Sequence, residues 1–188
     1  MKKIPTIFKR NPENMSSLID ECHPDCLWVF NGEGVATRKL DGTSCLVRNG
    51  KFYKRREVKK GKTPPQDFIQ ETFDEVTGKR TGWVPVIHED KWHMEAWNHF
   101  EDGARADGTY ELVGPKIQGN PEKSSTHELL RHDYAQVLDC PFIGLKEIGD
   151  WLEGEEIEGV VWHHPDGRMA KIKRRDFGFD WPVTKESK

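Results

Sequence analysis

Long apolar runs, paired cysteines and a large excess of charge of one sign are all missing from this chain of 188 residues. No stretch approaches the roughly 18 apolar residues that a membrane-spanning helix needs, so we expect no membrane partner. The first residues, Met1 to Pro5, contain no apolar segment of the kind found in secretory signals. The four cysteines show no CxxC spacing, which argues against a disulfide framework and favours the reducing cytoplasm.

Neither sign of charge dominates, because the net charge is −3, but the charges are segregated along the chain. Residues 38–62 hold ten Lys and Arg against Asp41 and Glu57, whereas residues 147–158 hold six Asp and Glu and no Lys or Arg. Opposed blocks of this kind suit a site that binds polyphosphate on one side and a metal ion on the other. Solvated loops and surfaces would give the same pattern.

The length fits one domain or at most one and a half, and seven Trp residues argue against disorder. We expect residues 1–26 to form an N-terminal extension packed on a core of residues 27–188. Alternating apolar positions and turn residues predict an α+β fold dominated by antiparallel strands. Strands are expected at residues 27–30, 35–39, 43–48, 52–58, 109–113, 157–163 and 169–173. Helices are expected at residues 16–21, 91–100, 124–134 and 143–152, and residues 78–90 are expected to be irregular.

Four short segments place charged side chains on predicted strands or at their ends. In chain order they are Lys39-Leu40-Asp41-Gly42, Glu111-Leu112-Val113-Gly114, Glu158-Gly159-Val160-Val161 and Lys171-Ile172-Lys173. Each one alone has a plain explanation, such as a turn or an exposed strand end. Their joint occurrence in this order indicates nucleotide chemistry, since a Lys amine can attack the α-phosphate of ATP and cations neutralise the phosphates.

These segments resemble motifs I, III, IV and V of the covalent nucleotidyltransferases, the superfamily of ATP-dependent ligases and capping enzymes. Residues 109–121 and 158–173 are similar to the RNA ligases, and residues 33–177 resemble the small RNA ligase group that includes the vertebrate 5′-to-3′ RNA ligase. The resemblance implies an antiparallel-sheet, ATP-grasp-like adenylyltransferase core without an OB-fold domain. It also implies an enzyme that uses ATP with Mg²⁺ or Mn²⁺ to join an RNA 5′-phosphate to a 3′-hydroxyl.

The resemblance assigns roles to individual residues. Lys39 corresponds to the nucleophile that takes AMP, passes it to the RNA 5′-phosphate and is freed before the 3′-hydroxyl displaces AMP. Glu158 and Asp41 would hold the metal ion through its water shell. The side chains that would contact the nucleotide are Thr37, Arg38, Asp41, Arg55 (or Arg56 in its place), Glu111, Lys171 and Lys173.

Several features depart from the family pattern. Ser44 stands where many ligases carry an Arg, and no aromatic residue is identified for stacking on adenine, since Trp162 fits the core better. RNA is expected to contact the basic residues from Lys54 to Lys62 and the pair Arg174-Arg175, although a solvated loop and pair would look the same. Two other functions stay open: a non-catalytic nucleic-acid-binding module with a degenerate nucleotide site, and a capping-type guanylyltransferase. The sequence gives no prediction of the oligomeric state.

Overall fold

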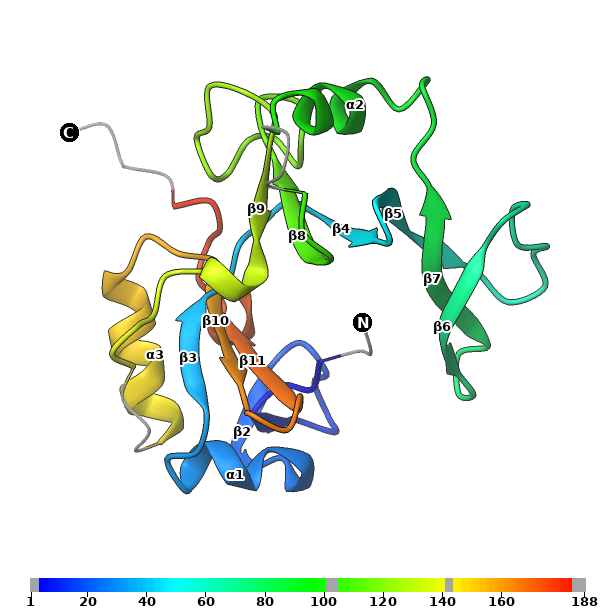
Figure 1. Cartoon of the computed structure of the whole chain (residues 1–188). Helices are drawn as coiled ribbons and strands as arrows, with labels where there is room; N and C mark the ends of the chain where they lie inside the picture. The colour runs from blue at the N-terminus through cyan, green and yellow to red at the C-terminus, as the bar shows by residue number, and fades with distance from the viewer. Residues whose placement is uncertain (1–3, 101–104, 141–143, 184–188) are drawn as a thin grey trace. The chain divides into compact units, whose positions relative to one another are not determined.

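The structure is a computed structural model that describes residues 4–100, 105–140 and 144–183. It is an α+β protein with antiparallel sheets and few helices, as predicted (Figure 1). None of the helices it describes is both long and apolar enough to cross a membrane.

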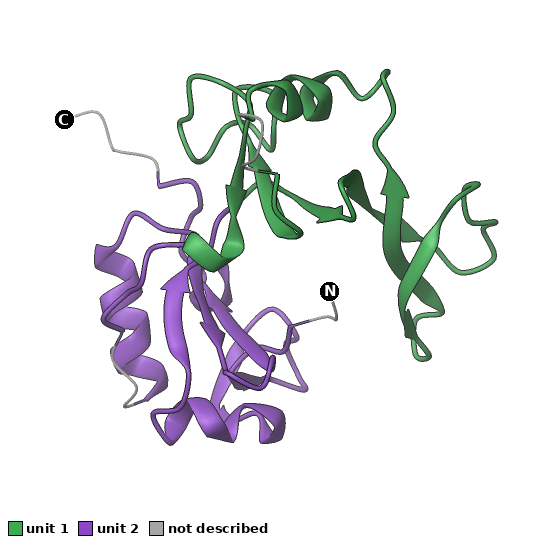
Figure 2. Ribbon diagram, in the orientation of Figure 1, with its two compact units in different colours: residues 1–3, 41–134 green, residues 4–40, 135–188 purple. Residues whose placement is uncertain are grey.

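Two compact units make up the chain, and Figure 2 shows them in green and purple. Unit 1 contains residues 41–134, and unit 2 contains residues 4–40 together with residues 135–188. The chain therefore passes from unit 2 to unit 1 directly after Leu40 and returns directly after Tyr134.

Unit 1 is built on a six-stranded sheet with the order β6-β7-β5-β4-β8-β9, in which all neighbours are antiparallel. The strands are β4 (Thr43–Arg48), β5 (Lys51–Val58), β6 (Ile69–Asp74), β7 (Lys79–Pro85), β8 (Gly108–Val113) and β9 (Glu128–Arg131). Helix α2 (Lys91–Asn98) packs its Ala96 against one face of this sheet, on buried side chains that include Val47, Tyr110 and Leu112. This burial stabilises the middle of the sheet and leaves its opposite face for other contacts.

Unit 2 contains a three-stranded antiparallel sheet with the order β11-β10-β3. Its elements are β1 (Phe8–Arg10), β2 (Leu18–Cys22), α1 (Leu27–Phe30), β3 (Val35–Arg38), α3 (Leu145–Gly154), β10 (Gly159–His163) and β11 (Met169–Lys173). Val160, Trp162 and Ile172 are fully buried on one face of the sheet and share a core with Ile148 and Leu152 of α3. Trp162 therefore belongs to the core, as its sequence context favoured.

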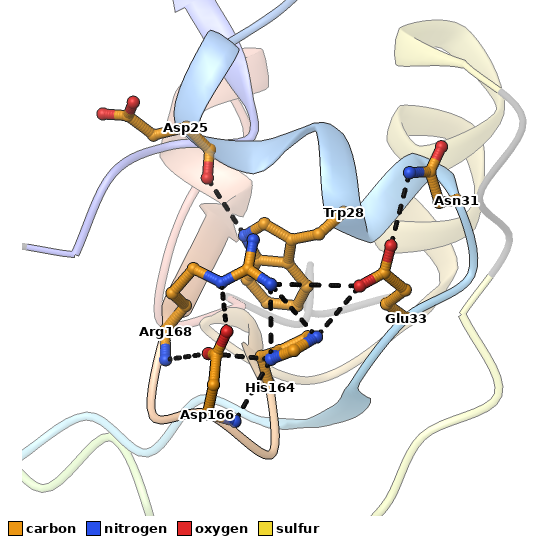
Figure 3. Close-up of polar contacts among 7 residues, drawn as sticks. All are labelled: Asp25, Trp28, Asn31, Glu33, His164, Asp166 and Arg168. Carbon is orange, nitrogen blue, oxygen red and sulfur yellow. Dashed lines mark hydrogen bonds and ion pairs between the residues drawn. The ribbon is translucent and has the colours of Figure 1, made fainter.

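A polar network fixes the β10–β11 turn of unit 2 (Figure 3). His164 contacts Glu33 of the α1–β3 loop at 2.9 Å and Asp166 at 2.7 Å, and its ring meets that of Trp28 edge-on. The backbone N–H of Arg168, followed by its guanidinium, lowers the pKa of Asp166 to about 2. The turn thus joins β10 to β11 in one register, which sets the positions of the charged residues at the other end of the hairpin.

Several predicted elements were wrong. Residues 27–30 form the helix α1 rather than a strand, because the preceding turn, with Pro24 at its start, already winds the chain helically. A short apolar run cannot be assigned to helix or strand from periodicity alone. Residues 18–22 form β2 instead of a helix, because they pair with β1.

Two more errors lie in unit 1. The segment 124–134 was expected to be helical, but residues 128–131 form β9, which pairs with β8 and buries Leu129. The segment 78–90 was expected to be irregular, but residues 79–85 form β7, and β6 was not predicted at all. These segments become strands because β9 pairs with β8 and β7 pairs with β5. Local sequence propensity does not predict pairing between segments that are separated in the chain.

Candidate active site

The lysine of the first motif directly follows the last residue of β3 in unit 2. The backbone N–H of Lys39 donates to the carbonyl of Gly159 at 2.9 Å, which continues the pairing of β3 with β10. Gly159 in turn lies opposite Lys173 on β11. The sheet therefore brings Lys39, Glu158 and Lys173 to one end of three strands, although they are far apart in the sequence.

Strand alternation sorts the predicted residues of unit 2 between the two faces of this sheet. Thr37 pairs with Val161, which pairs with Lys171, so these positions share one face, and Lys39 and Lys173 lie two residues further along it. The opposite face is the hydrophobic core, and Arg38 alternates onto that side. Thr37, Lys39, Lys171 and Lys173 thus share one face of the sheet, and Arg38 lies on the other.

Lys39, Lys171 and Lys173 form the lysine cluster, with the carboxylate of Glu158 beside it. The Lys39 amine donates a hydrogen bond to Glu158, and both side chains are largely buried. Burial, followed by the charges of Lys173 and Lys39, lowers the pKa of Lys171 to about 8, despite the opposing effect of Glu158 and Asp176. An excess of positive charge in a partly buried place favours the binding of an anion such as a phosphate.

Gly159 has no room for a side chain. A Cβ atom there would lie 2.1 Å from the carbonyl oxygen of Ile172 and 2.8 Å from the Cα of Lys173. Both neighbours are backbone atoms of β11, so only a separation of the two strands would relieve the contact. Glycine after Glu158 therefore keeps the lysine pair of β11 close to the end of β10.

Glu111 of unit 1 lies on β8, and both of its carboxylate oxygens are engaged. Oε1 accepts from the backbone N–H of Gly42 at 3.0 Å, and Oε2 lies 3.0 Å from Nε2 of His132. His132 must donate there, because an ionised carboxylate can only accept, and its Nδ1 lies 2.9 Å from the hydroxyl of Thr109. Gly42 also packs against the carbonyl of Leu112, where a Cβ atom would come within 2.1 Å.

Arg55 lies on the same face of the unit 1 sheet as Glu111. Ser44 of β4 pairs with Glu111 of β8. The register of β4 with β5, continued one residue beyond the pair Cys45 and Lys54, places Arg55 opposite Ser44. The three positions therefore form one row across the sheet. Burial lowers the pKa of Arg55. The negative charge of Glu111, followed by that of Glu57, opposes this lowering, so Arg55 and Glu111 attract each other. Arg56 points to the opposite face by alternation.

Asp41 has its backbone N–H bonded to the carboxylate of Glu122 at 2.9 Å. Glu111 and Glu122 therefore accept from two consecutive N–H groups of the Lys-x-Asp-Gly segment, those of Gly42 and Asp41. Charge-assisted bonds of this kind are stronger than neutral ones, so they hold the segment that follows Lys39 in one conformation.

Metal ligation was predicted for Glu158 and Asp41, one in each unit. Among the described residues, no three His, Cys, Asp or Glu side chains are grouped as the ligands of a metal ion. Mg²⁺ commonly uses one or two carboxylates together with water and substrate phosphates, so a carboxylate such as Glu158 beside the lysine cluster fits it. The four cysteines are all free thiols.

Comparison with known proteins adds an independent observation. Residues 101–187 match the family described as RNA ligase 1. This part of the chain is therefore similar to RNA ligases. The curated "RNA ligase 1" of Danio rerio is 28% identical over 79% of this chain and 69% of its own length, and that of Mus musculus is 28% identical over 82% and 69%. The "RNA ligase 1" of Pongo abelii is 31% identical over 56% of this chain and 43% of its own length.

The resemblance predicted to RNA ligases is thereby confirmed. The family match includes Glu111, Glu158, Lys171 and Lys173, whereas Lys39 precedes it. The roles assigned to these residues stay predictions.

Two residues that the sequence analysis did not name, His132 and Glu122, contact predicted site residues. Both lie in segments without a recognisable motif, and only the pairing of β8 with β9 and the loop between them bring them to Glu111 and Asp41. No local signal in the sequence identifies either one.

Arg174 was predicted to contact RNA, and this was wrong. Its side chain is buried, and its guanidinium donates to the carbonyls of Leu152 and Glu155 at the end of α3 and to that of Asp180. Free carbonyls at a helix C-terminus attract a cation, so Arg174 has a structural role. Arg175 is exposed and donates to the carbonyl of Trp181.

Proposed function

We propose that the chain is an ATP-dependent RNA ligase in which Lys39 forms a covalent bond to AMP. The observation that carries the proposal is the lysine cluster: three amines at one end of the unit 2 sheet, with Glu158 hydrogen-bonded to Lys39 and Lys171 held at a pKa of about 8. The similarity to RNA ligases supports the choice of RNA as substrate. Residues 27–188 would form the nucleotidyltransferase core, with residues 1–26 as an extension.

In the first step the neutral Lys39 amine attacks the α-phosphorus of ATP. A phosphorus–nitrogen bond forms, the bond to pyrophosphate breaks, and the amine loses its proton, for which Glu158 is the adjacent acceptor. Lys171 and Lys173 share the face of Lys39 and would bind the α-phosphate. Glu111 would bind the ribose, held in orientation by Gly42 and His132.

In the later steps an oxygen of the RNA 5′-phosphate attacks the AMP phosphorus, which breaks the bond to Lys39 and returns a proton to its amine. The RNA 3′-hydroxyl then attacks the activated 5′-phosphate, loses its proton and expels AMP. Mg²⁺ or Mn²⁺, when bound, would neutralise phosphate charge, and Glu158 and Asp41 are the carboxylates that would hold it. Thr37, Arg38 and Arg55 are proposed only as further nucleotide contacts, and Thr37 already donates to the carbonyl of Val161.

One experiment separates this function from its alternatives. Wild type, Lys39→Ala and the control Lys51→Ala, which alters an exposed lysine of β5, are incubated with Mg²⁺ and either ATP or GTP labelled at the α-phosphorus. After denaturation, wild type and Lys51→Ala should carry label from ATP alone, and 5′-phosphorylated RNA should remove it and be sealed. Label from GTP alone would point to a capping-type enzyme, and no label from either would point to a non-catalytic module. The cytoplasmic location stays a prediction from the cysteine pattern.

A further inference from the structure

Arg56, Arg80 and Phe73 share one surface of unit 1, on β5, β7 and β6, the three strands of the sheet that are farthest from β9 (Figure 1). We infer that this surface, which we call the arm face, binds single-stranded RNA. The inference rests on the proposed function, since it names the place where the RNA substrate of that enzyme would be held.

The pairing register places the three side chains on one side of the sheet. Arg80 of β7 lies between Val58 of β5 and Phe73 of β6, and Arg56 lies two residues before Val58. Directly paired residues of antiparallel strands share a face, as do residues two apart on one strand. An irregularity in β6 between Gln70 and Thr72 brings Phe73 onto this side.

Arg56 and Arg80 are both exposed, and no hydrogen bond or ion pair within the described residues engages either guanidinium. Two acidic side chains nearby, those of Glu57 and Asp74, serve other contacts. Glu57 alternates to the opposite face and lies 3.1 Å from Lys79, while Asp74 accepts from the backbone of the β6–β7 turn. The arm face therefore presents unpaired positive charge, which complements a phosphate backbone.

Phe73 gives the arm face an aromatic surface. Its side chain is 52% exposed, although it lies on an edge strand where exposed apolar groups promote aggregation. The ring of half-buried Phe68 lies against Gly82, two residues along β7 from Arg80, because a Cβ atom at Gly82 would come within 2.9 Å of that ring. An exposed ring flanked by arginines is the combination on which unpaired bases stack in single-stranded nucleic acid complexes.

The basic loop that was predicted to contact RNA adjoins this end of the sheet. Lys59, Lys60 and Lys62 directly follow β5, and the side chain of Lys60 lies against Gly78 at the start of β7. All three lysines are exposed. The arm face and this loop are therefore neighbours, and together they form a larger positively charged surface.

The test measures binding of a labelled 5′-phosphorylated single-stranded RNA by fluorescence anisotropy between 50 and 200 mM salt. Each phosphate contact to a single strand contributes about 0.7 to the slope of log affinity against log salt. Arg56→Ala with Arg80→Ala should lower that slope by about 1.4 relative to wild type. Phe73→Ala should weaken binding about tenfold with an unchanged slope, and Phe73→Trp should restore it. The matched controls are Arg48→Ala, an exposed arginine of β4, and Val76→Ala, which is 95% exposed in the β6–β7 turn.

Three results would overturn the inference. The first is wild type that binds no RNA at 50 mM salt, and the second is arm-face variants with the affinity and slope of wild type. A dimer that dissociates in Phe73→Ala, with RNA binding unchanged, would assign the surface to a second copy of the chain and would also overturn it. Labelling of each variant with ATP is measured in parallel. Variants that lose RNA binding but are still labelled by ATP support the arm face. Wild type that is never labelled refutes the proposed function, and the RNA-binding measurement then tests the arm face independently of it.

Discussion

Replacing Lys171 by Met should make the protein more stable while it destroys the proposed site. In the folded protein the pKa of Lys171 is about 8 instead of its ordinary 10.5, because its charged form is partly buried beside Lys173 and Lys39. This difference corresponds to about 3 kcal/mol at most, and solvent access reduces it to about 1–2 kcal/mol. We therefore expect Lys171→Met to raise the free energy of unfolding by about 1–2 kcal/mol at pH 7, measured by urea denaturation without nucleotide or metal.

The pH dependence gives this prediction a sign that can be checked. Between a pKa of about 8 and 10.5 the unfolded chain binds more protons at Lys171 than the folded chain, so the stability of wild type rises with pH across that window. The advantage of Lys171→Met should accordingly be complete at pH 7 and disappear as the pH rises towards 10.5. The control Lys51→Met, at an exposed position, should change stability by less than about 0.5 kcal/mol at every pH. A variant that is no more stable than wild type at pH 7, or whose gain is the same at pH 10, would refute the reasoning.

Three further predictions concern the supports of the site. Gly159→Ala should lower the free energy of unfolding by about 1–3 kcal/mol in urea titrations, because the added Cβ meets the backbone of β11; unchanged stability would contradict the close contact. His132→Ala should weaken ATP binding about tenfold by calorimetry, since it leaves an oxygen of Glu111 unpaired, while His132→Gln should recover part of the affinity. Glu122→Ala should slow labelling by ATP about tenfold in a time course, because the Asp41 N–H loses its acceptor, and Glu122→Gln, which keeps an acceptor oxygen, should be closer to wild type. Equal rates for Glu122→Ala and wild type would show that this contact does not orient the segment.

The strands around the motifs could be predicted because their signals are local. The Asn49-Gly50 turn, the alternation in residues 52–58 and the turn before Met169 each determine structure within a few residues, and β4, β5, β10 and β11 occur where expected. The spacing of Lys171 and Lys173 likewise places both on one face. The same rule places Arg38 away from Lys39, which a stricter use of alternation would have predicted.

Other features depend on contacts between distant segments and have no local signal. The strand β9 forms because β8 offers it a partner, and its end carries His132 to Glu111. The role of Arg174 is decided by the C-terminus of α3, about twenty residues earlier in the chain. Its sequence context, a basic pair after a strand of lysines, indicates a phosphate contact equally well.

The account depends most on the claim that Lys39 becomes covalently attached to AMP. The direct measurement is the intact mass of the protein after incubation with ATP and Mg²⁺, followed by peptide mapping of the modified residue. We predict that wild type gains the mass of one AMP on the peptide containing Lys39 and that Lys39→Ala and Lys39→Arg gain nothing, since neither side chain offers a neutral amine. An adduct of equal yield in Lys39→Ala, or one mapped to Lys171 in wild type, would contradict the central claim.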